Sequence, residues 1–151
     1  MQVDKNNPDL LKLDNQLCFS LYVCSREIIR AYKPILSPLG LTYTGYVVMM
    51  ALWENDHIGV KELGDRIFLD SGTLTPLLKK MEKDGFVKRE RSAEDERSVI
   101  ISLTEKGHAV KEQCRSNPDN IICAAKLQEI DGDALMANLR KMISNFRETG
   151  V

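Results

Sequence analysis

The stretch LDSGTLTPLLKKMEKDG, Leu69–Gly85, decides the fold. Asp70 or Ser71 can cap the start of a helix here, and Gly85 can end it after about Asp84. Four apolar side chains recur at helical spacing and would pack on a preceding helix: Leu74, Leu77, Leu78 and Met81. We therefore expect an amphipathic helix whose other face is exposed.

The face opposite that apolar stripe is rich in hydroxyl groups at its start and basic further on. It presents Ser71, Gly72, Thr73, Thr75, Pro76, Lys79, Lys80 and Lys83. Hydroxyl groups and a proline ring can approach base edges and thymine methyls in a major groove, while amides and lysines neutralise phosphates. In an isolated helix such lysines more often form only a solvated face. The neighbouring elements favour a DNA recognition helix.

A short predicted helix at 60–67 precedes this segment, and two predicted strands follow it at 86–91 and 98–103. With the polar tip between the strands, this order predicts a winged helix-turn-helix over about 42–103. The strands carry Lys88, Arg89, Arg91 and Arg97, and the tip carries Glu94, Asp95 and Glu96. We expect Arg89 to bind DNA and Asp95 to hold Arg97, whose guanidinium enters the minor groove. The alternative for that pair is a surface salt bridge worth about 0–1 kcal/mol.

Amphipathic helices flank this region on both sides. The pattern predicts a helix at 12–32, a helix capped by Thr42 that runs to about Trp53, and helices after Thr104 and Asp131. The first helix has two adjacent apolar stripes, a wider buried face than a small domain can cover, which indicates a subunit interface. The expected fold is mainly α with a small β-hairpin wing. It is one domain over 1–151, with dimerisation helices at about 12–40 and 104–151.

Composition excludes several classes of protein. The net charge is −1, so DNA binding needs a local basic surface rather than a basic total. We see neither an apolar run of transmembrane length nor a signal-peptide pattern. The four cysteines include no C-x-x-C pair, and both histidines lie far from them in sequence. We therefore expect a cytoplasmic protein with reduced thiols, no metal, no cofactor and no membrane partner.

Cys18 and Tyr22 stand one helical turn apart near the start of the first helix. Only a thiolate attacks a peroxide, and the helix dipole and a phenol donor would both favour the thiolate. Asp14, one turn earlier, opposes it, and no Lys or Arg lies within four positions of Cys18. Taken alone, a cysteine on a helical stripe is usually a small core residue, a role that we assign to Cys24.

Three stretches of this sequence resemble the corresponding stretches of a known protein family. The wing segment RSAEDER, Arg91–Arg97, and the helix at Leu69–Gly85 are similar to those of the MarR family of dimeric winged-helix regulators. The stretch LDNQLCFSLY, Leu13–Tyr22, resembles its organic-hydroperoxide-resistance repressors, the OhrR branch. The resemblance runs from about Leu13 to Gly107 and says little beyond it.

The resemblance implies that organic peroxides oxidise the cysteine of the first helix and that DNA is then released. The residues that match the sensor of this branch are Cys18, Tyr22, Tyr32 and Tyr43, and tyrosines of both subunits surround the thiol in such proteins. Some members use a distal cysteine to form an intersubunit disulfide, for which Cys123 is favoured over Cys114 here. A small-molecule thiol is the alternative partner.

The spacing of Cys18 and Tyr32 adds a constraint. They lie fourteen positions apart, about 21 Å along a continuous helix at 1.5 Å per residue. They can meet only across an antiparallel two-fold dimer, where residue i contacts j and j contacts i. The tyrosine cage therefore predicts a homodimer.

We expect a dimeric repressor that binds a pseudo-palindromic operator in double-stranded DNA when reduced and leaves it when organic hydroperoxide oxidises Cys18. One alternative is a MarR-type repressor released by a phenolic ligand, with Cys18 incidental. The other is a thiol peroxidase, which lacks the nearby arginine that would polarise a peroxide. The chain is thus expected not to be an enzyme.

Overall fold

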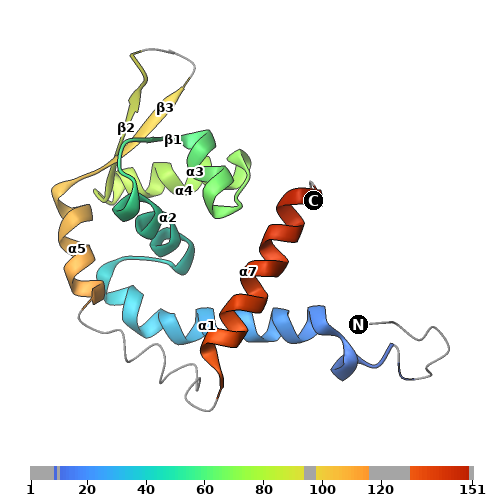
Figure 1. The fold of residues 1–151 in the computed structure, drawn as a ribbon. Coiled ribbons are helices and arrows are strands. Elements are labelled where there is room, and N and C mark those ends of the chain that lie inside the picture. The colour runs from blue at the N-terminus through green and yellow to red at the C-terminus, as the bar shows by residue number, and fades with distance from the viewer. Residues whose placement is uncertain (1–8, 10, 94–97, 116–129, 150–151) are drawn as a thin grey trace. The chain divides into compact units, whose positions relative to one another are not determined.

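The computed structural model describes residues 9, 11–93, 98–115 and 130–149. The chain divides into two compact units, 1–117 and 118–151. The first unit holds every described element up to α5, and the second holds α7 (Gly132–Thr149). Figure 1 shows the first unit as helices beside a small sheet. Within the described residues, no single helix is long and apolar enough to cross a membrane; α1–η2 and α2 meet that criterion only as a pair bent by 75°.

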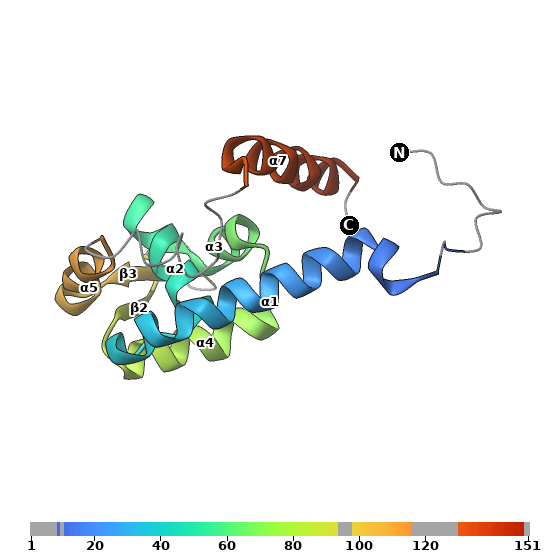
Figure 2. The same cartoon turned by 90° about the horizontal axis from the view of Figure 1, so that it is seen from below.

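The N-terminal helix begins and ends four to five residues later than the predicted helix at 12–32. A 3₁₀ turn, η1 (Leu13–Asn15), precedes α1 (Leu17–Leu36), because Gln16 is extended. Pro34 lies inside α1, so the helix does not stop before this proline, as the predicted end at 32 requires. Because proline has no N–H, the carbonyl of Arg30 lacks its helical hydrogen-bond donor. Both residues are exposed, so water can bind that carbonyl instead. Figure 2 shows α1 as one long helix.

The core is built on α2 (Tyr43–Glu54), which follows the 3₁₀ turn η2 (Ser37–Leu39). Thr42 caps α2 as predicted, since its Oγ1 accepts a hydrogen bond from the Gly45 amide at 3.1 Å. The sequence pattern favours Tyr46, Val47, Met50 and Leu52 as the apolar side of this helix, but the first three are half-buried and only the last of the four is buried. Val48, Met49 and Leu52 are the large buried side chains, because α2 is covered on more than one side.

The helix-turn-helix consists of α3 (Val60–Ile67) and α4 (Ser71–Lys83). Leu63 of α3 and Leu74 and Leu78 of α4 are fully buried, which confirms the predicted packing of the two helices. The turn is tight: a Cβ on Gly64 would lie 2.7 Å from the Leu69 carbonyl oxygen. This close approach fixes where α4 begins.

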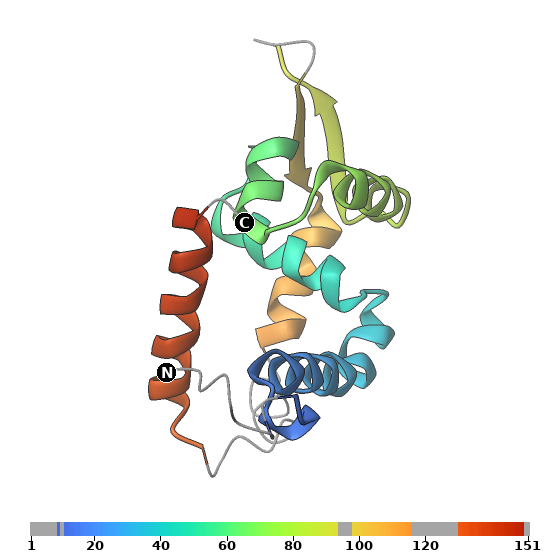
Figure 3. The same cartoon turned by 90° about the vertical axis from the view of Figure 1, so that its right-hand side faces the viewer.

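The wing consists of β2 (Val87–Arg91) and β3 (Val99–Leu103), paired antiparallel with Val87 opposite Leu103. Figure 3 shows the two strands extending beyond the helices. The predicted hairpin is confirmed, but the sequence missed β1 (Ile58–Gly59), which gives the sheet the order β1-β3-β2. Ser102 of β3 is buried, although it alternates along the strand with the buried Ile101 and Leu103.

Behind the wing, α5 (Glu105–Arg115) starts at the predicted cap, where Thr104 Oγ1 accepts from the Gly107 amide at 3.1 Å. The same hydroxyl donates to the Gly85 carbonyl at 2.6 Å, which ties the end of α4 to the start of α5. In the second unit, Asp131 caps α7 through the Ala134 amide at 3.0 Å, as expected. The break predicted at Asn117-Pro118 lies outside the described residues.

Candidate functional site

The start of α4 is held rigidly by Asp70. Its carboxylate accepts hydrogen bonds from the Thr73 amide at 2.9 Å and the Thr73 hydroxyl at 2.8 Å. These bonds from Thr73 lower the pKa of Asp70 below its ordinary value, because they stabilise the ionised carboxyl. Ser71 and Thr73 are exposed at the N-terminal end of α4. This is the end that a recognition helix presents to base edges.

The basic face of α4 is exposed as expected. Lys79, Lys80 and Lys83 all point to solvent, and Pro76 is exposed within the helix. Thr75 is half-buried and lines a hollow of about 520 Å³ between α3, α4 and the wing strands. The lysines are thus free to meet phosphates, whereas Thr75 is partly withdrawn from such a contact.

Arg89, predicted to bind DNA, lies against α4 instead of projecting from the wing. Its guanidinium is 3.4 Å from the Glu82 carboxylate, which also accepts the Arg89 amide at 3.1 Å. The Arg89 side chain is only 20% exposed and fastens the wing to the recognition helix, and its contact with DNA stays a prediction. The sequence reasoning overlooked Glu82. Asp95 and Arg97, predicted at the tip of the wing, lie outside the described residues.

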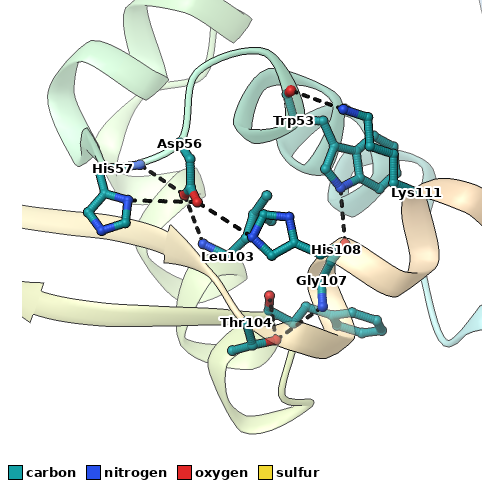
Figure 4. Close-up of polar contacts among 9 residues, drawn as sticks. Trp53, Asp56, His57, Leu103, Thr104, Gly107, His108 and Lys111 are labelled. Carbon is teal, nitrogen blue, oxygen red and sulfur yellow. Dashed lines mark hydrogen bonds and ion pairs between the residues drawn. The ribbon is translucent and has the colours of Figure 1, made fainter.

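A polar joint at the base of the wing was also missed by the sequence reasoning. Asp56 accepts hydrogen bonds from the His57 and Leu103 amides, each at 2.9 Å. The imidazoles of His57 and His108 lie at 3.7 and 3.8 Å from its other oxygen, on opposite sides of the carboxylate (Figure 4). One carboxylate therefore connects the end of α2, strand β3 and helix α5. Among the described residues, no cluster of His, Cys, Asp or Glu could hold a metal ion.

Trp53 forms the second part of this joint. Its indole Nε1 donates to the Gly107 carbonyl at 3.0 Å, and its own carbonyl accepts from Lys111 Nζ at 3.3 Å (Figure 4). Gly107 leaves no space for a larger residue, because an added Cβ would lie 2.3 Å from the Phe86 carbonyl oxygen. The joint positions α5 against both α2 and the sheet.

The predicted sensor thiol stands at the beginning of α1. Cys18 is exposed and is the second residue of the helix, where backbone amides have no intrahelical acceptor and the dipole favours an anion. Tyr22 is 57% exposed. Its hydroxyl accepts a hydrogen bond at 3.3 Å from Nη1 of Arg26, which lies one helical turn after Tyr22, whereas Cys18 lies one turn before it. A bond between Tyr22 and the Cys18 thiolate stays a prediction.

At the far end of α1, the structure brings Tyr32 and Tyr43 together. Their rings are 5.1 Å apart, and the Tyr46 ring lies 5.8 Å from that of Tyr32. Burial, followed by the neighbouring phenols, raises the pKa of Tyr32, so this residue stays a neutral hydrogen-bond donor. Cys18 lies on the same continuous helix as Tyr32, so one chain cannot bring them together.

The other cysteines differ in their surroundings. Cys24 is exposed, so its predicted role as a core residue is wrong for the single chain. Cys114 is half-buried in α5, and burial raises the pKa of its thiol. Cys123, the favoured resolving thiol, lies outside the described residues.

Taken together, these features define a winged helix-turn-helix DNA-binding protein with a thiol-bearing helix beside the DNA-binding region. The family described as "Transcriptional regulator SarA/Rot" matches residues 30–114. The organic hydroperoxide resistance transcriptional regulator of Bacillus subtilis (strain 168) is 44% identical over 144 residues, covering 95% of this chain and 98% of that protein.

Solved structures are similar as well. Reduced AbfR bound to DNA is 35% identical with a TM-score of 0.73 and covers 92% of this chain and 97% of its own. Overoxidized AbfR bound to DNA is 33% identical (TM-score 0.71; 91% and 97% covered). Wild-type MarR from E. coli is 27% identical (TM-score 0.68; 85% and 96%). The chain belongs to the MarR/SarA family of winged-helix transcriptional regulators; it binds DNA and is not an enzyme.

Proposed function

We propose that this regulator is a homodimeric repressor that senses organic hydroperoxides through Cys18. The observation that carries the proposal is the layout of α1. The helix holds an exposed thiol at its N-terminus and a packed tyrosine pair, Tyr32 and Tyr43, beside its other end. The similarity to a Bacillus subtilis organic hydroperoxide resistance regulator supports the same chemistry.

The surface of α1 supports a dimer. Of its twenty residues, all of them described, Leu36 alone is buried. Leu17 is 51% exposed, Tyr22 57% and Ile29 40%, and these side chains lie within about 140° of one another around the helix, an apolar surface that a second copy would cover. In an antiparallel pair, the Cys18 of each subunit would lie over the Tyr32 of the other, completing two thiol–tyrosine sites.

The oxidation itself is a two-electron step. The Cys18 thiolate attacks the terminal peroxide oxygen, so that a sulfur–oxygen bond forms as the oxygen–oxygen bond breaks. Sulfur is oxidised to a sulfenic acid, and the alkoxide that leaves takes a proton from water to become an alcohol. The neutral Tyr32 and Tyr43 hydroxyls would donate hydrogen bonds to the thiolate before the reaction.

The next step decides whether DNA is released. Both the reduced and the overoxidized forms of AbfR have been solved bound to DNA. This favours a disulfide as the signal that releases this protein from DNA. The disulfide forms when a second thiol attacks the sulfur of the sulfenic acid, and the hydroxide that is displaced takes up the proton of that thiol and leaves as water. Cys123 of the other subunit or a small-molecule thiol would supply that sulfur. The half-buried Cys114 is poorly suited, because its raised pKa disfavours the thiolate.

DNA release then follows from geometry. Two recognition helices must fit major grooves about 34–36 Å apart, one helical turn of DNA. A bulky disulfide between the paired α1 helices would change their separation. The joint around Asp56 and Trp53 fastens the wing to α2 and α5, so each DNA-binding region would move as one body.

A gel-shift titration tests the proposal. Wild type, Cys18→Ser and Cys24→Ser are compared on the same operator DNA, with and without cumene hydroperoxide; Cys24 is the matched control because it is also exposed on α1. We expect wild type and Cys24→Ser to release DNA on oxidation and Cys18→Ser to stay bound. Release of Cys18→Ser by hydroperoxide would refute the proposal. Non-reducing electrophoresis of the samples identifies the second sulfur.

One observation supports the alternative of ligand-controlled release. The hollow of about 520 Å³ between α3, α4 and the wing is lined by Thr75, Arg89 and Ser98 among others. A phenolic acid bound there would contact Arg89 and compete with DNA. Release of the reduced Cys18→Ser variant by salicylate, with a loss of that response in Arg89→Met, would favour this second function.

A further inference from the structure

A basic hollow lies at the junction of α1 and α2, beside the tyrosine pair. It has a volume of about 390 Å³, and its walls include Arg26, Arg30, Lys33, Thr42 and Tyr43. Among the described side chains that line it, every charged one is cationic. Most of the wall is apolar, and the aliphatic stems of the cationic side chains can form part of it.

These cations are only weakly compensated. Arg30 pairs with Glu27 at 3.8 Å, with side chains 80% and 55% exposed, and such surface pairs contribute little. Arg26 donates a hydrogen bond to the Tyr22 hydroxyl rather than to a carboxylate. The hollow therefore suits an occupant that brings negative charge.

The register of the proposed dimer identifies that occupant. If Cys18 faces the partner's Tyr32 in an antiparallel pair, the residue numbers of any two facing positions add to 50. Lys33 then faces position 17 of the other subunit, and Arg30 faces position 20. Successive residues of an α-helix are rotated by about 100° around its axis. Relative to Tyr32, Cys18 is therefore rotated by roughly 40° and Lys33 by roughly 100°, both in the same direction around the helix. In a two-fold antiparallel pair the same flank of both helices lies on one side. The partner subunit's Cys18 therefore comes to the flank that carries Lys33 and the hollow.

Charge complementarity agrees with this register. The segment that leads into α1 carries Asp14, and Cys18 itself becomes anionic when it reacts. No Lys or Arg lies within four positions of Cys18, so its own helix offers no cationic side chain nearby. The other copy of the chain provides cations at the facing positions.

We infer that this hollow receives the first turn of α1 of the partner subunit, and that Lys33 and Arg30 stabilise the Cys18 thiolate across the interface. The inference rests on the proposed homodimer and deepens it. Each sensor then combines a thiol from one chain with phenols and cations from the other. Lys33 and Arg30 act as positioning and electrostatic residues, since neither needs to touch the peroxide.

The test uses full-length protein in which Cys18 is the remaining cysteine, with Cys24, Cys114 and Cys123 replaced by Ser. The rate of Cys18 alkylation by iodoacetamide is measured from pH 5 to 10. Arg30→Met/Lys33→Met removes the charges, whereas Arg30→Lys/Lys33→Arg keeps them at the same positions. We expect the midpoint of the alkylation profile to rise by about one pH unit in the first variant, the effect of losing close opposite charges. It should stay unchanged in the second.

Sedimentation and circular dichroism verify that both variants are folded dimers. Should the double Met variant fail to dimerise, wild type in 0.05 and 0.5 M NaCl replaces it, where salt must raise the midpoint. An identical midpoint with and without the charges, or at both salt concentrations, overturns the inference. Failure of the proposed function is distinguishable from this outcome, because wild-type protein would then stay on DNA after hydroperoxide treatment.

Discussion

The packing around Gly107 allows a prediction of magnitude. Replacing this residue with Ala puts a Cβ at 2.3 Å from the Phe86 carbonyl oxygen and 3.1 Å from Leu103 Cδ2. Real Cβ atoms stay beyond 3.0 Å, so the backbone of α5 or of Phe86 must move. The Phe86 oxygen accepts hydrogen bonds from both the amide and the hydroxyl of Thr104, each at 3.1 Å, so a shift weakens both.

The separate contributions can be estimated. Overpacking costs about 1–3 kcal/mol, and each weakened hydrogen bond about 0.5–1.5 kcal/mol. Replacing Gly by Ala inside a helix by itself stabilises the helix by about 1 kcal/mol. We therefore expect Gly107→Ala to lower the free energy of unfolding by about 3 kcal/mol, a large part of the roughly 5–15 kcal/mol of an ordinary domain.

Urea unfolding followed by circular dichroism measures this loss, at one protomer concentration for all variants, because dimer stability depends on concentration. Gly59→Ala is the matched control, since a Cβ there meets nothing within 4 Å. The control should stay within about 0.5 kcal/mol of wild type. If Gly107→Ala also stays within that range, the reasoning from close packing at the start of α5 is refuted.

Three further predictions concern DNA binding, acid stability and the thiols. Lys83→Ala should weaken operator binding without altering sequence preference and should reduce the slope of log affinity against log salt by about one, as for a lost phosphate contact; an unchanged slope would remove Lys83 from the DNA interface. The lowered pKa of Asp70 means that its charged cap stabilises the fold above the ordinary carboxyl range and is lost as pH falls through the folded value. Melting curves should therefore show wild type more stable than Asp70→Asn at pH 6, with the difference shrinking as pH falls below the ordinary carboxyl range, and a constant difference would contradict the assignment. Cys114→Ser should leave hydroperoxide-induced DNA release intact, because burial raises the pKa of this thiol; a gel shift showing loss of release would identify Cys114 as the resolving sulfur after all.

Much of the fold was predictable because its signals are local. The cap of α4 at Asp70, the cap of α2 at Thr42 and the apolar face with Leu74 and Leu78 are each encoded within a few residues. The lysines of α4 are exposed as the pattern predicts. The proline rule failed at Pro34, since a solvent-exposed helix tolerates a lost bond where water can replace it.

The polar contacts that shape the site were not predictable in the same way. Trp53 and Gly107 are 54 positions apart, and Asp56 and Leu103 are 47 apart. No periodicity connects such residues, and the neighbours in sequence of a half-buried acid or indole do not reveal its partner. Strand β1 was missed for the same reason: two residues have no period, and pairing with β3 alone defines them.

Spacing and caps encode the helix at Ser71–Lys83, the wing strands and the thiol at the start of a long helix, so these features can be predicted from local sequence. Which groups work together depends on how the chain packs. This packing turned Arg89 onto Glu82, packed Tyr32 against Tyr43, and left the apolar face of α1 exposed beside a cationic hollow. These results depend on how distant segments pack, because burial and charge at a site are set by every element around it.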